Sequence, residues 1–255
     1  MTVYSHSRLS TFEQCKLKYK FKYIDKLTPD FEKSIEAHLG TCVHDTLEWL
    51  YSNVLNDFIP ELDRIIEFYT NKWQEDYKEN FKVVRKDAKP EDYFSKGIKF
   101  LVDYYLKNSP FQDGTIDVEK EVYIILDETS PHKIKGFIDR LVFNKEKNRY
   151  EVHDYKTASS LPNPNKFEND RQLALYSLAI KQTYGYDKEI ILIWHYLDHN
   201  KRIESKRTNE QLENLRKQTI ELIEKIEKTK EFPPEPSALC DWCEYRDQCP
   251  YWKGR

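Results

Sequence analysis

Three strand-like segments follow one another in the middle of the chain, and they constrain the fold more than any other feature. They are "TIDVEKEVYIIL" (115–126), "IKGFIDRLVFN" (134–144) and "RYEVHDYKT" (149–157), which are rich in β-branched and aromatic residues and are joined by short polar turns. Strands that are joined so closely pair with their chain neighbours as an antiparallel meander. The sequence therefore predicts a sheet that is built around this meander.

A helix is predicted directly after the meander. Residues 167–185 have helical periodicity, with Asn169 or Asp170 as the N-cap and Gly185 as the stop.

The last regular elements are a strand and a helix. The nearly continuous apolar run at 188–198 predicts a buried strand. A long helix at 208–230 is predicted to begin at a capping box of Thr208 and Gln211. Strands that alternate with helices in this way predict an α/β fold with a mixed central sheet flanked by helices.

The part of the chain before the meander reads as helical. Ser10 and Glu13 form a capping-box pattern at the start of a first helix, and a second helix is predicted from about Leu39. The apolar stripe of the second helix consists of Val43, Leu47, Leu50 and Val54. Residues 61–79 and 91–108 predict two more helices, which we interpret as a helical insertion.

We expect one domain that spans residues 1–255. Its parts are the N-terminal helices (1–56), the helical insertion (57–110), an αβ core (111–230) and a cysteine-rich tail (231–255).

Composition excludes several classes of protein. With six glycines the chain has neither a GxGxxG nor a GxxxxGK[ST] phosphate loop, and a net charge of -3 is not typical of a general nucleic-acid binder. No apolar stretch is long enough to span a membrane, and the N-terminus lacks the apolar core of a signal peptide. We therefore expect a cytoplasmic protein without a membrane partner.

Two acids and a lysine stand out on the meander. Asp139 lies on its second strand, and Asp154 and Lys156 lie two residues apart at the end of the third, so that they share a face while Tyr155 points the other way. An ordinary surface ion pair is the simplest explanation. Alternatively, two converging carboxylates suit Mg²⁺ or Mn²⁺, and Lys156 then orients or deprotonates water or stabilises a phosphate during its hydrolysis.

Three further polar residues are weaker candidates. Gln172 and Tyr176 are four apart on one helix face, and His44 lies beside an apolar helix stripe. Gln172 and Tyr176 could contact a sugar–phosphate backbone or support Lys156, but their spacing alone favours ordinary helix packing. A histidine such as His44 is usually a satisfied core or boundary residue, and its imidazole could equally be a third metal ligand.

Four motifs give the chain a resemblance to a known family. "GTCVH", "GFIDR", "DYKT" and "QLALY" occur in the order and rough spacing of the RecB-like branch of PD-(D/E)xK nucleases, over nearly the whole chain apart from about 57–110. The resemblance implies a restriction-endonuclease-like fold and a Mg²⁺- or Mn²⁺-dependent deoxyribonuclease. The implied metal ligands are His44, Asp139, Asp154 and the backbone carbonyl of Tyr155; the implied catalytic residues are Asp139, Asp154 and Lys156, assisted by Gln172 and Tyr176.

The cysteines predict a second metal site. Cys240, Cys243 and Cys249 have the spacing C-x2-C-x5-C, and a tetrahedral site needs a fourth thiol, for which Cys15 is preferred over Cys42. Zinc is the default occupant. The resemblance instead favours a [4Fe–4S] cluster, because nucleases of the AddB type and the CRISPR-associated type bind one with an N-terminal cysteine and three C-terminal ones. Lys16 departs from that pattern, since many relatives have proline after the first cysteine.

The leading interpretation is a metal-dependent DNA exonuclease that acts on single strands or frayed ends, in DNA repair and recombination or in CRISPR-type DNA processing. The lysines and aromatics of "KLKYKFKY" (16–23) suit either strand binding or an amphipathic helix that faces the core. Either the protein works alone, or a helicase or CRISPR-adaptation proteins act with it in trans. The alternatives are a non-catalytic DNA-binding or assembly subunit and a zinc-stapled hydrolase with another substrate.

Overall fold

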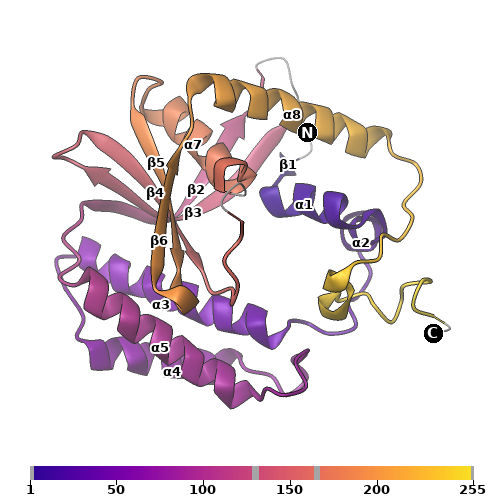
Figure 1. Ribbon diagram of the computed structural model, residues 1–255, viewed down its shortest axis with the longest axis horizontal. Coiled ribbons are helices and arrows are strands. Elements are labelled where there is room, and N and C mark those ends of the chain that lie inside the picture. The colour runs from indigo at the N-terminus through magenta and orange to yellow at the C-terminus, as the bar shows by residue number, and fades with distance from the viewer. Residues whose placement is uncertain (1–2, 128–131, 164–166, 254–255) are drawn as a thin grey trace.

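The fold is built on a six-stranded mixed sheet, described here from a computed structural model for residues 3–127, 132–163 and 167–253 (Figure 1). The strands are β1 Val3–Tyr4, β2 Thr115–Ile125, β3 Lys133–Asn144, β4 Arg149–Lys156, β5 Glu189–Tyr196 and β6 Lys201–Lys206. β2, β3 and β4 form the predicted antiparallel meander, β5 pairs parallel to β4, and β6 returns antiparallel along β5. The short β1 pairs parallel to β3.

Helices cover both faces of this sheet, so the α/β layers predicted from the sequence are confirmed (Figure 1). One face is covered by α1 His6–Gln14, α7 Arg171–Tyr184 and α8 Asn209–Lys228; the other is covered by α3 Ile35–Leu55, α4 Leu62–Asp76 and α5 Pro90–Asn108. Short helical turns complete the chain: α2 Lys16–Tyr19, the π-helix η1 Lys20–Ile24, and the 3-10 helices η2 Leu197–His199 and η3 Ala238–Trp242.

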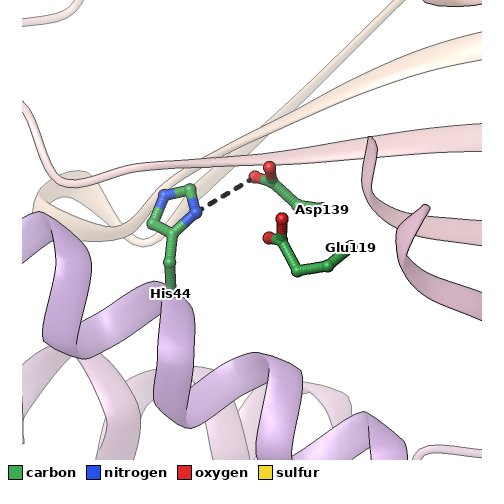
Figure 2. Close-up of side chains that lie close together, drawn as sticks. All are labelled: His44, Glu119 and Asp139. Carbon is green, nitrogen blue, oxygen red and sulfur yellow. Dashed lines mark ion pairs between the residues drawn. The ribbon is translucent and has the colours of Figure 1, made fainter. Parts of the chain in front are cut away.

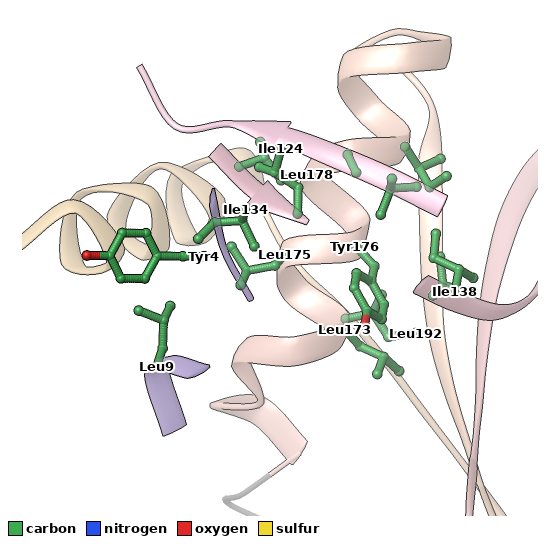
Figure 3. Packing of buried hydrophobic residues seen from close by; sticks show 14 of the residues in the cluster. Tyr4, Leu9, Ile124, Ile134, Ile138, Leu173, Leu175, Tyr176, Leu178 and Leu192 are labelled. Carbon is green, nitrogen blue, oxygen red and sulfur yellow. The ribbon is translucent and has the colours of Figure 1, made fainter. Parts of the chain in front are cut away.

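Each face has its own hydrophobic core. On the α7 side, Leu175 and Leu178 of the helix pack with Ile124, Ile134 and Leu192 of the strands (Figure 3). On the other side, α3, α4 and α5 bury a second cluster rich in aromatic residues. Burying apolar area on both faces fixes the position of the sheet between the helices, and with it the ends of β3 and β4.

The cap residues of the two later helices agree with the sequence pattern. Asp170 caps α7 by accepting a hydrogen bond from the Leu173 amide at 2.8 Å, and α7 ends at Gly185, whose φ is 115°. The Thr208 hydroxyl accepts from the Gln211 amide at 3.1 Å, and the Gln211 side chain accepts from the Thr208 amide at 2.8 Å.

The predicted capping box of the first helix is wrong. α1 begins at His6, because the Ser5 hydroxyl accepts a hydrogen bond from the Arg8 amide at 3.1 Å, and Ser10 lies inside the helix. The helix also stops earlier than expected: Cys15 is extended, with φ -164° and ψ 114°, and separates α1 from α2.

Two further elements differ from the prediction. α3 begins at Ile35 rather than near Leu39, since the Ser34 hydroxyl caps it through the Ala37 amide at 3.2 Å. The strand β6 has no counterpart in the prediction: its sequence "KRIESK" is strongly charged, and such residues are tolerated because it lies at the edge of the sheet. None of the described helices combines the length and apolar character needed to cross a membrane.

We predict that Gly97→Ala destabilises the protein. A Cβ at this buried position of α5 would lie 2.0 Å from the hydroxyl oxygen of Tyr69 and 2.9 Å from Leu39 on α3. Overpacking of this kind costs about 1–3 kcal/mol and exceeds the gain of about 0.5–1 kcal/mol that alanine brings to a helix. Urea denaturation measures the difference, and Ser95→Ala on the exposed side of α5 is the control, for which we expect no loss of stability.

Candidate active site

Three side chains from three elements meet beside the sheet. His44 projects from α3, Glu119 from β2 and Asp139 from β3, and each offers a ligand atom within 4.8 Å of the other two (Figure 2). His44 Nδ1 lies 3.4 Å from Asp139 Oδ2. An imidazole and two carboxylates form a donor set that is suited to a divalent cation.

The peptide of Tyr155 holds two of these ligands in place. Its N–H donates to Asp139 Oδ2 at 2.8 Å, and its carbonyl oxygen lies 2.8 Å from His44 Nε2. Because a carbonyl oxygen only accepts, Nε2 carries a proton in this contact, and Nδ1 is the imidazole nitrogen that faces Asp139. An imidazole nitrogen and a carboxylate oxygen that face each other at this distance require a cation or a proton between them.

The electrostatics of the acids indicate the same need. Burial, followed by the charge of Asp154, raises the pKa of Asp139 to about 7, although the adjacent His44 opposes this shift. Burial also raises the pKa of Glu119. A bound divalent ion would compensate these charges, so the residues present fit the metal that the sequence predicts.

Asp154 and Lys156 form a second part of the site. Asp154 is only 2% exposed, so the pair is not an ordinary surface ion pair. Lys156 Nζ lies 2.9 and 2.8 Å from the two carboxylate oxygens of Asp154 and donates to Gln172 Oε1 at 3.2 Å. Although burial opposes the charged form, the charge of Asp154 raises the pKa of Lys156, so the amine is protonated.

Gln172 is in turn supported by its own helix. Its amide nitrogen lies 3.5 Å from the Tyr176 hydroxyl, and the Tyr176 ring lies against Gly136 of β3. A Cβ on Gly136 would be 2.4 Å from that ring, which explains the glycine of "GFIDR". The structure thus brings Asp154, Lys156, Gln172 and Tyr176 into one chain of contacts.

A buried network supports the site from the opposite face of β4. The Tyr155 side chain points away from Asp154 and Lys156, and its hydroxyl accepts from Arg140 Nε at 2.9 Å. The same hydroxyl lies 3.2 Å from that of Tyr104, and Arg140 Nη2 lies 2.7 Å from His153 Nδ1. Arg140 is 1% exposed, so these bonds form away from solvent and fix the orientation of the Tyr155 side chain.

Apart from Tyr176, the residues predicted for the nuclease site line one cavity. A cavity of about 720 Å³ is lined by His44, Asp139, Asp154, Tyr155, Lys156 and Gln172, with Tyr176 behind Gln172. Glu119 is the one residue of the site that the sequence did not single out. Val118 pairs with Arg140 and Lys120 with Ile138, so the register places Glu119 beside Asp139.

The reason that Glu119 was missed is local backbone geometry. Its φ is 42°, in the left-handed region that side chains other than glycine rarely occupy. Strict alternation along a strand therefore cannot tell which of the acids in "DVEKE" faces the site. Residues in such sparsely populated conformations cluster at functional sites.

The cysteines lie in a separate place. Cys15, Cys240, Cys243 and Cys249 line one cavity between α1–α2 and the C-terminal tail. Cys42 is buried in α3, where burial raises its pKa to about 12.

Ion pairs join the two chain segments around the cysteine cavity. Lys16 pairs with Glu235 at 2.9 Å, and Lys18 and Lys22 pair with Glu244 at 2.7 and 3.1 Å. Tyr19 is buried. The segment "KLKYKFKY" therefore faces the protein, as the amphipathic alternative predicts.

Comparison with known proteins places this geometry in a family. Residues 3–250 match the family model described as "PD-(D/E)XK nuclease superfamily". The chain belongs to this superfamily. PD-(D/E)XK nucleases use divalent metals, which agrees with the donor set of His44, Glu119 and Asp139.

Two solved structures are similar to this PD-(D/E)XK nuclease. The crystal structure of the "Putative exonuclease" from Eubacterium rectale matches with a TM-score of 0.51 at 13% identity, over 93% of this chain and 86% of that one, which is a likeness of fold. The crystal structure of SSO0001 matches with a TM-score of 0.37 at 18% identity, over 64% of this chain and 71% of that one. No curated protein matches.

We predict that Asp139→Asn stabilises the metal-free protein at pH 8. The pKa of Asp139 is raised from 3.8 to about 7 in the folded protein. Between about pH 4 and pH 7 the unfolded chain has therefore released a proton that the folded protein keeps, and the free energy of unfolding falls as pH rises through this range. The melting temperature of the variant in EDTA should exceed that of the wild type at pH 8, and the difference should shrink toward pH 5.

Addition of Mn²⁺ should reverse the order of the two proteins at pH 8. The ion compensates the carboxylates of the wild type and raises its melting temperature, whereas the variant lacks a ligand. Glu121→Gln, also on β2 but exposed, is the control that should respond to Mn²⁺ like the wild type. An equal Mn²⁺-dependent shift in Asp139→Asn and wild type would contradict the metal assignment.

Proposed function

We propose that the protein is a metal-dependent exonuclease that hydrolyses phosphodiester bonds at the ends of single-stranded or frayed DNA. The observation that carries this proposal is the cluster of His44, Glu119 and Asp139, whose ligand atoms lie within 4.8 Å of one another, with Lys156 in the cavity that His44 and Asp139 line. A nuclease needs such a combination, because a scissile phosphate carries negative charge that increases during hydrolysis.

The residues have distinct roles in this proposal. His44, Glu119, Asp139 and Asp154 hold Mg²⁺ or Mn²⁺, with the Tyr155 carbonyl as a further oxygen ligand. When bound, the ion lowers the pKa of water and neutralises charge on the phosphate. Lys156 donates hydrogen bonds to the phosphate oxygens, since its raised pKa keeps it protonated.

Gln172 and Tyr176 position Lys156 rather than contact the phosphate. Gln172 accepts a hydrogen bond from Lys156 Nζ at 3.2 Å, and Tyr176 lies behind it. This contact would hold the amine at the cavity if Asp154 served as a metal ligand. The intact pair of Asp154 and Lys156 favours a catalyst over a non-catalytic DNA-binding subunit.

The test of this function is degradation of end-labelled DNA. We predict that Mn²⁺ supports release of nucleotides from linear single strands and that Lys156→Met lowers the rate by about 100-fold or more, the usual effect of losing one charge-stabilising donor. Lys147→Met, at the exposed turn between β3 and β4, should leave the rate unchanged.

The choice of DNA separates the remaining alternatives. Label at the 5′ or the 3′ end reports polarity, and a circular single strand should resist an enzyme that needs an end. Wild type that binds DNA but digests none of these substrates would indicate the non-catalytic alternative.

We further propose that Cys15, Cys240, Cys243 and Cys249 bind a [4Fe–4S] cluster that joins the two ends of the chain. One supporting observation is that all four line one cavity. Another is the spacing of the sulfurs: the five cysteines all lie in the described part of the chain, and no three of them have Sγ atoms within 4.8 Å of one another. A tetrahedral zinc site with Zn–S bonds of about 2.3 Å needs sulfurs about 3.8 Å apart, whereas a cluster puts each thiolate on a different iron.

We predict that protein purified without oxygen is brown and holds about four iron and four sulfide ions per chain, the stoichiometry of the cluster. Cys240→Ser should lose the colour, melt at lower temperature and retain DNA less well, because the long loop from Cys15 is no longer closed. Cys42→Ser should keep the colour. A colourless wild type with one zinc ion per chain would establish the zinc alternative.

The cellular setting follows from this function. We propose that the protein acts in the cytoplasm, in repair and recombination or in CRISPR-type DNA processing, either alone or with a helicase or CRISPR-adaptation proteins in trans.

A further inference from the structure

The wall of the catalytic cavity includes residues from the C-terminal tail. Leu239 and Trp242, in η3, line the same cavity as His44, Asp139 and Lys156. Both side chains are exposed, by 56% and 40% respectively. The tail is far from the meander in sequence, so its large apolar side chains reach the catalytic cavity only through the fold.

Trp242 differs from the other four tryptophans of the chain. Trp49, Trp73, Trp194 and Trp252 each pack against another ring, with ring centroids 4.4 to 5.4 Å from their nearest partners. Within residues 3–127, 132–163 and 167–253, Trp242 makes neither a ring contact nor a side-chain hydrogen bond. An isolated exposed apolar residue is common on proteins, but an indole without partners in a catalytic cavity offers a free face to a ligand.

Cationic side chains also line the cavity. Arg85 and Lys96 of the helical region lie there with Lys156, beside Glu36. Arg85 pairs with Asp87 at 3.3 Å and Lys96 with Asp198 at 2.6 Å, so a phosphate would compete with these carboxylates for them. Cations that follow a phosphate chain and an aromatic ring on which a base stacks are the two components of single-strand binding sites. Inside a duplex each base is stacked on both sides and only the terminal pair has a free face, so a single strand offers bases to the ring that a duplex does not.

We propose that Trp242 stacks on a base of single-stranded DNA that enters the catalytic cavity, and that this contact selects single strands over duplex. Leu239 extends the same apolar surface. The inference rests on the proposed function for its substrate class, and it assigns the choice of strand to the cysteine tail rather than to the metal site.

The position of Trp242 depends on the cysteines on either side of it. Cys240 lies within η3 and Cys243 directly follows it; the Cys240 amide donates to the Ser237 carbonyl at 3.1 Å and the Cys243 amide to the Cys240 carbonyl at 3.2 Å. The Cys240 sulfur also accepts from the Ser237 amide at 3.4 Å. Whatever holds these cysteines therefore also holds the stacking residue at the cavity.

The experiment measures binding in EDTA, so that it does not depend on hydrolysis. Fluorescence anisotropy with a labelled thymidine oligonucleotide should show that Trp242→Ala binds roughly 5- to 150-fold more weakly, the equivalent of about 1–3 kcal/mol of stacking on one base. Trp242→Phe should recover much of the affinity. Trp252→Phe, at the packed tryptophan of the same tail, should bind like the wild type.

An abasic oligonucleotide of the same length separates stacking from a structural role. It keeps the phosphates but has no base, so the wild type and Trp242→Ala should bind it equally. Equal binding of the thymidine oligonucleotide by these two proteins would overturn the proposal, as would an equal loss of affinity on both oligonucleotides. Hydrolysis of bis(p-nitrophenyl) phosphate with Mn²⁺ should not change in Trp252→Phe, and its absence in the wild type would count against the proposed function alone.

Discussion

The site depends on one physical constraint, which is that buried carboxylates gather where nothing in the chain fully neutralises them. His44 Nδ1 faces Asp139 Oδ2 at 3.4 Å, and its Nε2 lies 2.8 Å from the Tyr155 carbonyl oxygen. Lys156, the cation that contacts these acids directly, is paired with Asp154. A fold that retains such an arrangement at the expense of its own stability does so for a ligand, and a divalent ion is the ligand that these donors select.

Much of the fold could be predicted because its signals are local. The meander, the caps of α7 and α8 and the buried strand β5 follow from residue periodicity and cap chemistry over a few positions. Dependence on local signals also explains why the predicted start of the first helix was wrong. Both Ser5 and Ser10 precede helical sequence, and only the hydrogen bond that Ser5 accepts in the structure identifies it as the N-cap. β6 was missed because an edge strand does not need apolar residues.

The site was predictable in part. Spacing placed Asp154 beside Lys156, and the structure keeps that pair and adds Gln172. Glu119 was beyond reach because its left-handed backbone breaks the alternation on which such reasoning depends. The role proposed for Trp242 could not be predicted from the sequence either, because only tertiary packing brings this residue into the cavity that His44 and Asp139 line.

The network behind β4 has a consequence for the choice of ion. The peptide of Tyr155 holds His44 and Asp139, and its side chain is fixed from the other face by Arg140 and Tyr104. Because the peptide and the side chain of Tyr155 are both held by hydrogen bonds, the distance between His44 and Asp139 cannot increase easily. Ca²⁺ needs six to eight oxygens at about 2.3–2.6 Å, whereas Mg²⁺ accepts fewer protein ligands at about 2.0–2.1 Å and keeps its waters. We therefore expect rigidity on the far side of one strand to favour the smaller of these two cations.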